Sequence, residues 1–242
     1  MQGIIGGFAN GDPSAIQRRR AGDPFAALLA GLGVRVWLDA HGGTYLSTTG
    51  ALVDTAIDRS GSGLDATASG GARPAFDAGA FGGRGGMLFA GAQVLVTPAF
   101  SMGTRSSGCG VWRVDVTNSG LCEFGAFNTH AYVYHAGPPG TEHRVACGGG
   151  DEARGLGTLS TTLRVTWRMD PSGIRARFND VLVTAGGASG TPAAATDSLY
   201  MGGLSRGTIL RLRGAIGELV LADALWSDAE MDAVDAALAQ RW

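Results

Sequence analysis

Residues 34–40 (Val-Arg-Val-Trp-Leu-Asp-Ala) carry the clearest structural signal near the start of this 242-residue chain. The apolar residues Val34, Val36 and Leu38 occupy every second position, which is the period of a half-buried β-strand. Residues 58–66 (Asp-Arg-Ser-Gly-Ser-Gly-Leu-Asp-Ala) follow, and their Asp, Ser and Gly residues favour a structured turn. We therefore predict that the main domain begins with a strand and a structured turn.

The end of the chain carries a second signal. After residues 214–221 (Gly-Ala-Ile-Gly-Glu-Leu-Val-Leu), Ser227 is followed three residues later by Glu230, which is the capping box of a helix start. The apolar residues that follow fall at helical spacing and predict one buried face, made of Met231, Val234, Leu238 and Trp242. A short helix is therefore predicted to close the chain.

Between these segments the pattern is that of strands and tight turns. Residues 163–169 and 174–178 are predicted strands around an Asp-Pro-Ser-Gly turn, and Asn179-Asp180 is a predicted hairpin tip before the next strand. Residues 111–116 alternate, with Trp112, Val114 and Val116 expected on one face. Further strands are predicted at 93–96, 121–127, 130–135 and 199–203. The fold class is therefore all-β.

The opening and closing segments together resemble the concanavalin A-like, laminin-G-like β-sandwich of bacterial and phage surface proteins. Residues 199–203 (Leu-Tyr-Met-Gly-Gly) and the strand pair around Asn179-Asp180 are similar to further elements of that family. The resemblance covers residues 34–242 and implies a jelly-roll sandwich with a short C-terminal helix. Such domains usually bind glycans or build assemblies, and some relatives are enzymes.

Residues 1–33 differ in composition from the rest and form a predicted N-terminal extension. They combine a Gly-rich apolar start with a basic run at 18–20, and Gly31 and Gly33 are expected to end a helical stretch. We interpret this segment as an anchor that binds other virion proteins or a neighbouring copy, so a homo-oligomer is expected. A simple solvated face is the alternative interpretation of the basic run.

Charge and hydropathy argue against nucleic-acid binding, a membrane span and a secretory signal. A formal net charge of −2 gives no field that would favour nucleic acid. No apolar run is long enough to span a bilayer, and the N-terminus does not have the pattern of a secretory signal. The expected location is therefore a virion surface, reached from the bacterial cytoplasm by release with a particle.

Catalytic patterns are weak. Glucanases on this scaffold carry Glu-x-Asp-x-Glu on one strand, whereas Glu123, Glu142 and Glu218 are isolated, and Asp151-Glu152 are neighbours that would point to opposite faces. No catalytic residue is therefore assigned, and the chain is predicted not to be an enzyme. The alternative is a glycan-cleaving lyase or hydrolase.

Metal and cysteine patterns are also sparse. Cys109, Cys122 and Cys147 lack zinc-ligand spacing and are interpreted as small buried residues, although a Cys109–Cys122 bridge stays open. No cofactor and no metal site are predicted. Calcium is the one ion considered, at three acidic residues that could equally stabilise turns: Asp54, Asp58 and Asp65.

The predicted ligand site consists of His130, Tyr132 and Tyr134, which share one strand face by the two-residue period. Such an aromatic and polar face suits a sugar ring, so the expected ligand is cell-surface polysaccharide. The predicted function is that of a non-enzymatic spike or fibre subunit of a phage or phage-like particle, with a lectin-like domain for host attachment. If the chain is an enzyme instead, His130 and Tyr132 are its candidate residues. A purely structural module whose aromatic face is a subunit interface is the third possibility.

Overall fold

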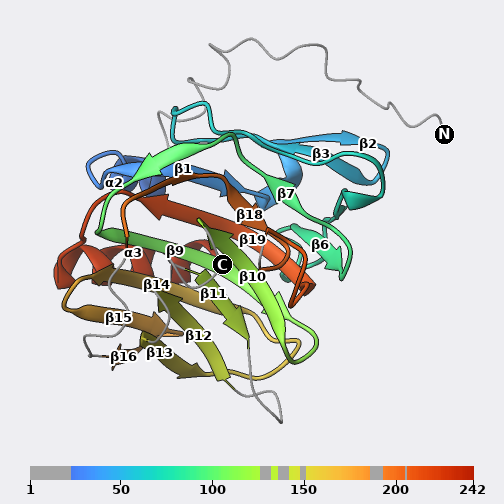
Figure 1. Cartoon of the computed structure of the whole chain (residues 1–242). Coiled ribbons are helices and arrows are strands. Elements are labelled where there is room, and N and C mark those ends of the chain that lie inside the picture. Colours follow the sequence, from blue (N-terminus) through green and yellow to red (C-terminus); the bar gives the residue numbers. More distant parts are fainter. Residues whose placement is uncertain (1–22, 126–131, 136–141, 148–150, 186–192, 205) are drawn as a thin grey trace.

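The protein is a sandwich of two curved, mainly antiparallel sheets with helices on one outer face (Figure 1). The computed structural model describes residues 23–125, 132–135, 142–147, 151–185, 193–204 and 206–242. The predicted all-β jelly roll with a closing helix is confirmed. Within the described residues, no helix is both long and apolar enough to cross a membrane.

The back sheet is built around the long strand β19, and the helices cover its outer face. Its order is β1 (Val34–Asp39), β19 (Arg213–Ala222), β9 (Ser106–Val114), β14 (Leu163–Asp170), β15 (Gly173–Phe178) and β16 (Val181–Ala185). At its start, β19 also pairs with β6 (Gly86–Ala90), which pairs with β5 (Ala75–Asp77).

The front sheet faces the viewer in Figure 1. Its order is β2 (Leu46–Thr49), β3 (Leu52–Ala56), β4 (Ala66–Thr67), β7 (Leu95–Val96), β18 (Leu199–Met201), β10 (Ser119–Phe124), β11 (Tyr132–His135), β12 (Glu142–Cys147) and β13 (Asp151–Leu156). A separate pair is formed by β8 (Phe100–Met102) and β17 (Ala195–Asp197), and the single-turn helices η1 (His41–Gly43) and η2 (Gly70–Ala72) lie in loops.

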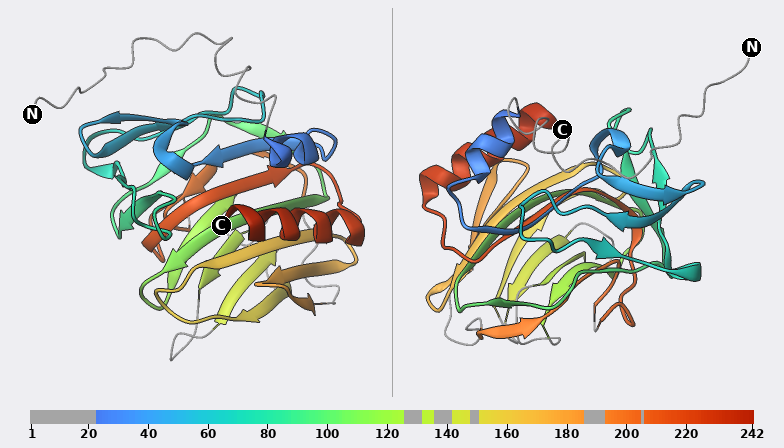
Figure 2. Two further views of the ribbon diagram at one scale, coloured as in Figure 1. Left: turned by 180° about the vertical axis from the view of Figure 1, so that it is seen from behind. Right: turned by 90° about the horizontal axis from the view of Figure 1, so that it is seen from above.

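Two apolar layers hold these elements together. The larger one fills the space between the sheets and includes Trp112, Phe124 and Trp167. The second one lies between the back sheet and the helices α2 (Pro24–Leu29) and α3 (Asp228–Arg241), as Figure 2 shows. Strand β1 contributes to both layers, so Trp37 and Asp39 are as buried as Leu38. The expectation of a half-buried strand was therefore wrong, because the helices cover its second face.

Helix α3 begins as the sequence predicts. The Ser227 hydroxyl accepts a hydrogen bond from the Glu230 backbone N–H, and the Glu230 carboxylate accepts one in return from the Ser227 N–H at 2.6 Å. Met231, Val234 and Leu238 are buried against the back sheet. The capping box and the buried helix face are confirmed.

Residues 23–33 pack on the sandwich. The Asp23 carboxylate caps α2, Pro24 occupies its first turn, and Phe25 and Leu29 are buried in the second layer. Gly33 has a φ of 66°, which favours glycine. Residues 1–22 lie outside the described residues, so the anchoring role of the N-terminal segment stays a prediction.

One expectation from the sequence is corrected, and the buried position expected for the cysteines is confirmed. Strand β9 ends at Val114, and Val116 is 36% exposed rather than on the buried face. All three cysteines are buried, and Cys109 lies in the second layer while Cys122 lies between the sheets. A Cys109–Cys122 bridge is therefore excluded by the two faces that these side chains occupy, and burial raises the pKa of the Cys109 thiol.

Candidate functional site

The outer face of the front sheet is the candidate site. Eight residues on eight neighbouring strands are successive pairing partners and form one row across the sheet. They are Thr55, Thr67, Val96, Tyr200, Glu123, Tyr132, Ala146 and Glu152. Residues that oppose one another in a sheet share a face, so this row is continuous across the sheet. Most of the row is polar or aromatic, which suits a ligand with many hydroxyl groups.

Two of the three predicted ligand residues lie at or beside this row. Tyr132 takes its place between Glu123 and Ala146, and Tyr134 pairs with Arg144 one step along β11. His130 lies outside the described residues. The structure thus gives the backbone positions of the two tyrosines, and ligand contact stays a prediction for all three residues.

Four charged side chains gather on the neighbouring strands β12 and β13. We call them the front-face quartet: Glu142, Arg144, Glu152 and Arg154. The Arg144 guanidinium contacts the Glu152 carboxylate at 2.8 Å and the Glu142 carboxylate at 3.1 Å. The Arg154 guanidinium reaches the same two carboxylates at 2.9 and 3.7 Å. The quartet therefore offers fixed donors and acceptors side by side.

A turn between β18 and β19 bounds this surface. Leu204 pairs with Ile209, is fully buried, and packs against Ala146. It lies so close to Gly120 that any side chain at that position would collide with it. We call this segment, which comprises Leu204 and residues 206–210, the β18–β19 turn. It covers the middle of the front face.

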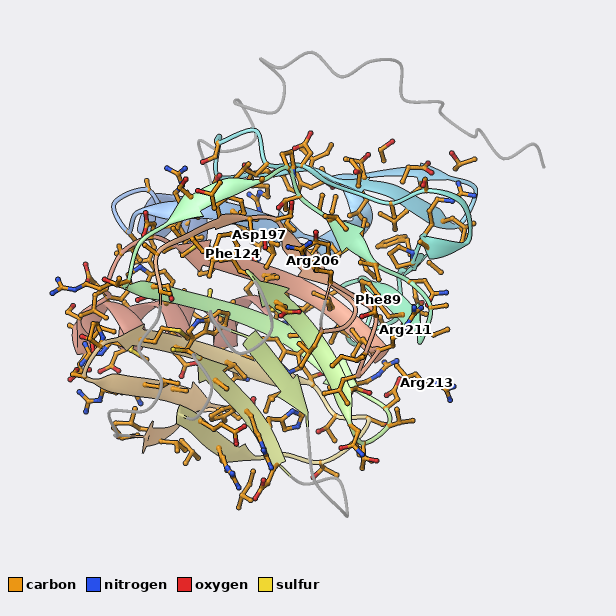
Figure 3. The ribbon with its side chains drawn as sticks, viewed as in Figure 1. Phe89, Phe124, Asp197, Arg206, Arg211 and Arg213 are labelled. Atoms are coloured by element: carbon orange, nitrogen blue, oxygen red, sulfur yellow. The ribbon has the colours of Figure 1, made fainter. Side chains whose placement is uncertain are left out.

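The same turn also buries Glu123. The Arg206 backbone N–H donates to the Glu123 carboxylate at 3.2 Å, and the Arg206 guanidinium contacts Asp197 at 3.3 Å. Figure 3 shows Arg206 beside Asp197, with Arg211 and Arg213 farther along the chain. Glu123 is 1% exposed. The surface left for a ligand therefore lies on either side of the turn, and the quartet occupies one side.

A second cluster, behind the back sheet, has a structural role. The Arg59 guanidinium contacts Asp39 and, at 2.7 Å, Asp23. The Arg241 guanidinium contacts Asp39, Asp23 at 3.3 Å and Glu218 at 3.0 Å. We call these five residues the buried charge network. It joins the opening and closing segments of the sequence.

Aromatic rings surround the buried charge network. The indole N–H groups of Trp37 and Trp242 donate to the Glu218 carboxylate at 2.7 and 2.5 Å. The Arg59 guanidinium lies 3.7 Å from the ring centroid of Trp37 and 4.1 Å from that of Tyr45. These contacts are typical of cation–π packing inside a protein. The contacts link β1, β19 and the end of α3, so the cluster holds the fold together.

The carboxyl groups of Glu218 and Asp235 have raised pKa values. Burial and the neighbouring Asp39 raise the pKa of Glu218 to about 7, although Arg241 and the two indole donors oppose this shift. Burial and Asp180 raise the pKa of Asp235 to about 6. Asp235 lies on α3 and Glu218 on β19, so both groups belong to the helix-covered side of the back sheet.

The three candidate calcium ligands are engaged by protein donors. The Asp58 carboxylate accepts the backbone N–H groups of Trp37, Ser60 and Leu64, at 2.9 to 3.1 Å. Asp65 accepts the Asp58 N–H, and Asp54 pairs with an arginine. Among the described residues, no three His, Cys, Asp or Glu side chains are grouped to hold a metal ion. The geometry is that of turn-stabilising hydrogen bonds.

The front-face quartet was not predicted from the sequence. Glu142 and Glu152 were treated as separate carboxylates, because nothing in the sequence gave the register that brings β12 beside β13. One signal was present. Both strands carry Glu-x-Arg, at 142–144 and 152–154, and this spacing puts both charges of each strand on one face.

No family model and no curated protein matches the chain by sequence, but solved structures share its fold. Domain 4 of AbnA, an extracellular GH43 arabinanase from Geobacillus stearothermophilus, was solved in complex with arabinotriose. It matches with a TM-score of 0.58 at 12% identity, over 84% of this chain and 98% of that domain.

Two toxin domains match as well. The binding domain of Paraclostridial Mosquitocidal Protein 1 has a TM-score of 0.59 at 9% identity, over 86% of this chain and 52% of that one. The botulinum neurotoxin serotype D binding domain has a TM-score of 0.57 at 10% identity, over 87% and 53%. This chain thus spans about half the length of either toxin domain. At these identities the likeness establishes a shared β-sandwich fold.

Proposed function

We propose that this protein is a carbohydrate-binding domain and that the outer face of its front sheet holds the glycan. The observation that carries the proposal is the front-face quartet, in which two carboxylates and two guanidiniums are fixed beside the register positions of Tyr132 and Tyr134. Sugars need directional hydrogen bonds next to aromatic or apolar surface, and this face combines both kinds of group.

The fold comparison supports the same ligand class. Domain 4 of the arabinanase was solved with arabinotriose, and it shares the sandwich over nearly its whole length. Because a shared fold does not fix function, the proposal rests first on the side chains of the front face.

We propose binding without cleavage. A glycosidase needs a carboxylic acid that keeps its proton near neutral pH and reaches the glycosidic oxygen. Two carboxyl groups with raised pKa values, Glu218 and Asp235, lie on the helix-covered side of the back sheet rather than on the front face. This arrangement favours binding over hydrolysis on the front face.

The proposed setting is a spike or fibre of a phage or phage-like particle, where the domain binds host polysaccharide. This part of the proposal is supported by the resemblance of the opening and closing segments to phage surface domains. Residues 1–22 are the proposed contact with other particle proteins. A chain that lacks residues 1–22 is expected to keep its fold and to lose incorporation into its assembly.

An adsorption assay tests the binding proposal. Tyr132→Ala combined with Tyr134→Ala should abolish adsorption to purified host polysaccharide, while the mass measured by light scattering stays unchanged. The control is Val181→Ala with Leu182→Ala on β16, where both side chains are exposed on the other sheet. Loss of the oligomer with retained adsorption would contradict the proposal and assign these tyrosines to a subunit interface. Release of reducing sugar would contradict the non-enzymatic part.

A further inference from the structure

We propose that the front-face quartet selects neutral sugars, an inference that rests on the carbohydrate-binding function proposed above. Its two glutamates and two arginines sum to zero formal charge. The ligand would therefore be bound through its hydroxyl groups.

The pairing inside the quartet is the first argument. Each carboxylate lies within 4 Å of both guanidiniums. A carboxylate on the ligand would have to displace Glu142 or Glu152 from arginines that already pair with it, and it would meet the repulsion of the displaced group. A hydroxyl group can instead donate to a carboxylate and accept from a guanidinium without breaking either pair.

The exposure of the quartet is the second argument. The side chains of Arg154 and Glu142 are 51% and 36% exposed, so a ligand can reach them. Arg144 and Glu152 are more buried, at 17% and 16%, and they hold the exposed pair in place. Charged groups fixed in this way lose little rotamer freedom when they bind a ligand.

An apolar contact lies beside these charges. Leu156 is 82% exposed and pairs with Glu142 in the β12–β13 register. Alternation along β13 places Leu156 on the same face as Glu152 and Arg154. A sugar ring has an apolar C–H face and polar edges, so it can cover Leu156 while its hydroxyl groups meet the quartet.

The β18–β19 turn limits the length of chain that can bind. Leu204 fills the middle of the front face over Gly120 and Ala146, between the quartet and Tyr200. A glycan therefore cannot lie along the whole row of the front sheet. The quartet is placed to hold a short stretch or an end of a neutral glycan.

The test compares neutral and acidic polysaccharides with the full-length protein. Dextran, arabinan, galactan and mannan serve as neutral probes, and polygalacturonate and alginate as acidic ones, each at low and high salt. We expect binding to at least one neutral probe, unchanged by salt, and weakened about tenfold by Arg154→Gln. The matched control is Arg177→Gln, which removes a surface arginine that pairs with Asp232 on α3.

Three other results would contradict the inference or the proposed function on which it rests. Preferential binding of acidic probes that is lost at high salt would overturn neutral selection and leave carbohydrate binding intact. Neutral binding that Arg154→Gln leaves unchanged would place the subsite away from the quartet and overturn the inference. If the protein binds none of the probes and does not bind host polysaccharide, the proposed function itself is overturned.

Discussion

Glu218 accepts hydrogen bonds from Trp37, Arg241 and Trp242, and so it joins β1 and the end of α3 to β19. Three carboxyl groups share two guanidiniums in the buried charge network, and all the described hydrogen-bond partners of Glu218 are donors. Glu218→Gln would set an amide N–H₂ group against those donors. We expect a loss of about 3 kcal/mol or more in the free energy of unfolding, measured by chemical denaturation.

The pH dependence of stability checks this account of Glu218. A carboxyl group whose pKa is raised from 4.5 to about 7 on folding binds its proton more tightly in the folded state. Its stabilising contribution is therefore full below pH 4.5 and is lost as the pH rises through about 7. The stability difference between the native chain and Glu218→Gln should shrink over that range. A difference that grows instead would contradict the raised pKa.

Asp58 provides a second prediction at the level of single residues. Its two carboxylate oxygens already accept hydrogen bonds from backbone N–H groups and a serine hydroxyl. We therefore expect chelation with EDTA to leave the melting temperature unchanged, and Asp58→Ala to lower it. A clear drop with EDTA that added calcium reverses would show that an ion binds the native protein.

The last two residues of the chain, Arg241 and Trp242, fasten helix α3 to the back sheet through ring packing and ion pairs. The Trp242 ring packs edge-on against Phe81 at a centroid distance of 5.3 Å, and Arg241 contacts three carboxylates of the buried charge network. Removal of Arg241 and Trp242 should cost about 3 kcal/mol or more, seen as a lower melting temperature. An unchanged melting curve would mean that the chain end does not pack on the sheet.

The β15–β16 hairpin has a strained tip. Asn179 and Asp180 have φ values of 46° and 72°, a region that glycine occupies at little cost. Asp180→Gly should therefore stabilise the protein by about 1 kcal/mol and lower the pKa of Asp235, because Asp180 contributes to raising it. Thermal unfolding and carboxyl-group NMR titration measure the two effects. Destabilisation would show that the Arg164–Asp180 ion pair outweighs the strain.

For the molecule as a whole, the sequence predicted the sandwich because its most distinctive residues are the ones that hold it together. Trp37, Arg59, Glu218 and Trp242 come from the opening and closing segments and meet in one buried cluster. The closing helix followed from its capping box, and the hairpin tip followed from its turn residues. These signals are local, so they can be recognised without knowing which strands pair.

The candidate site could be predicted only in part. Strand alternation predicted that Tyr132 and Tyr134 share one strand face, but the charged residues beside them depend on the register between β11, β12 and β13. The β18–β19 turn crosses the front face through contacts of Leu204 with residues far away in sequence. Such long-range contacts leave no local pattern, and so the boundary of the site came from the structure.

Hydrogen–deuterium exchange with a bound glycan tests the central claim, that the front sheet holds the ligand, most directly. The full-length protein would be compared with and without the polysaccharide to which it adsorbs. We predict slower exchange in peptides covering Tyr132–His135, Glu142–Cys147 and Asp151–Leu156, and no change in Asp228–Arg241. Protection confined to α3 or to β16, with the front strands unchanged, would contradict the account.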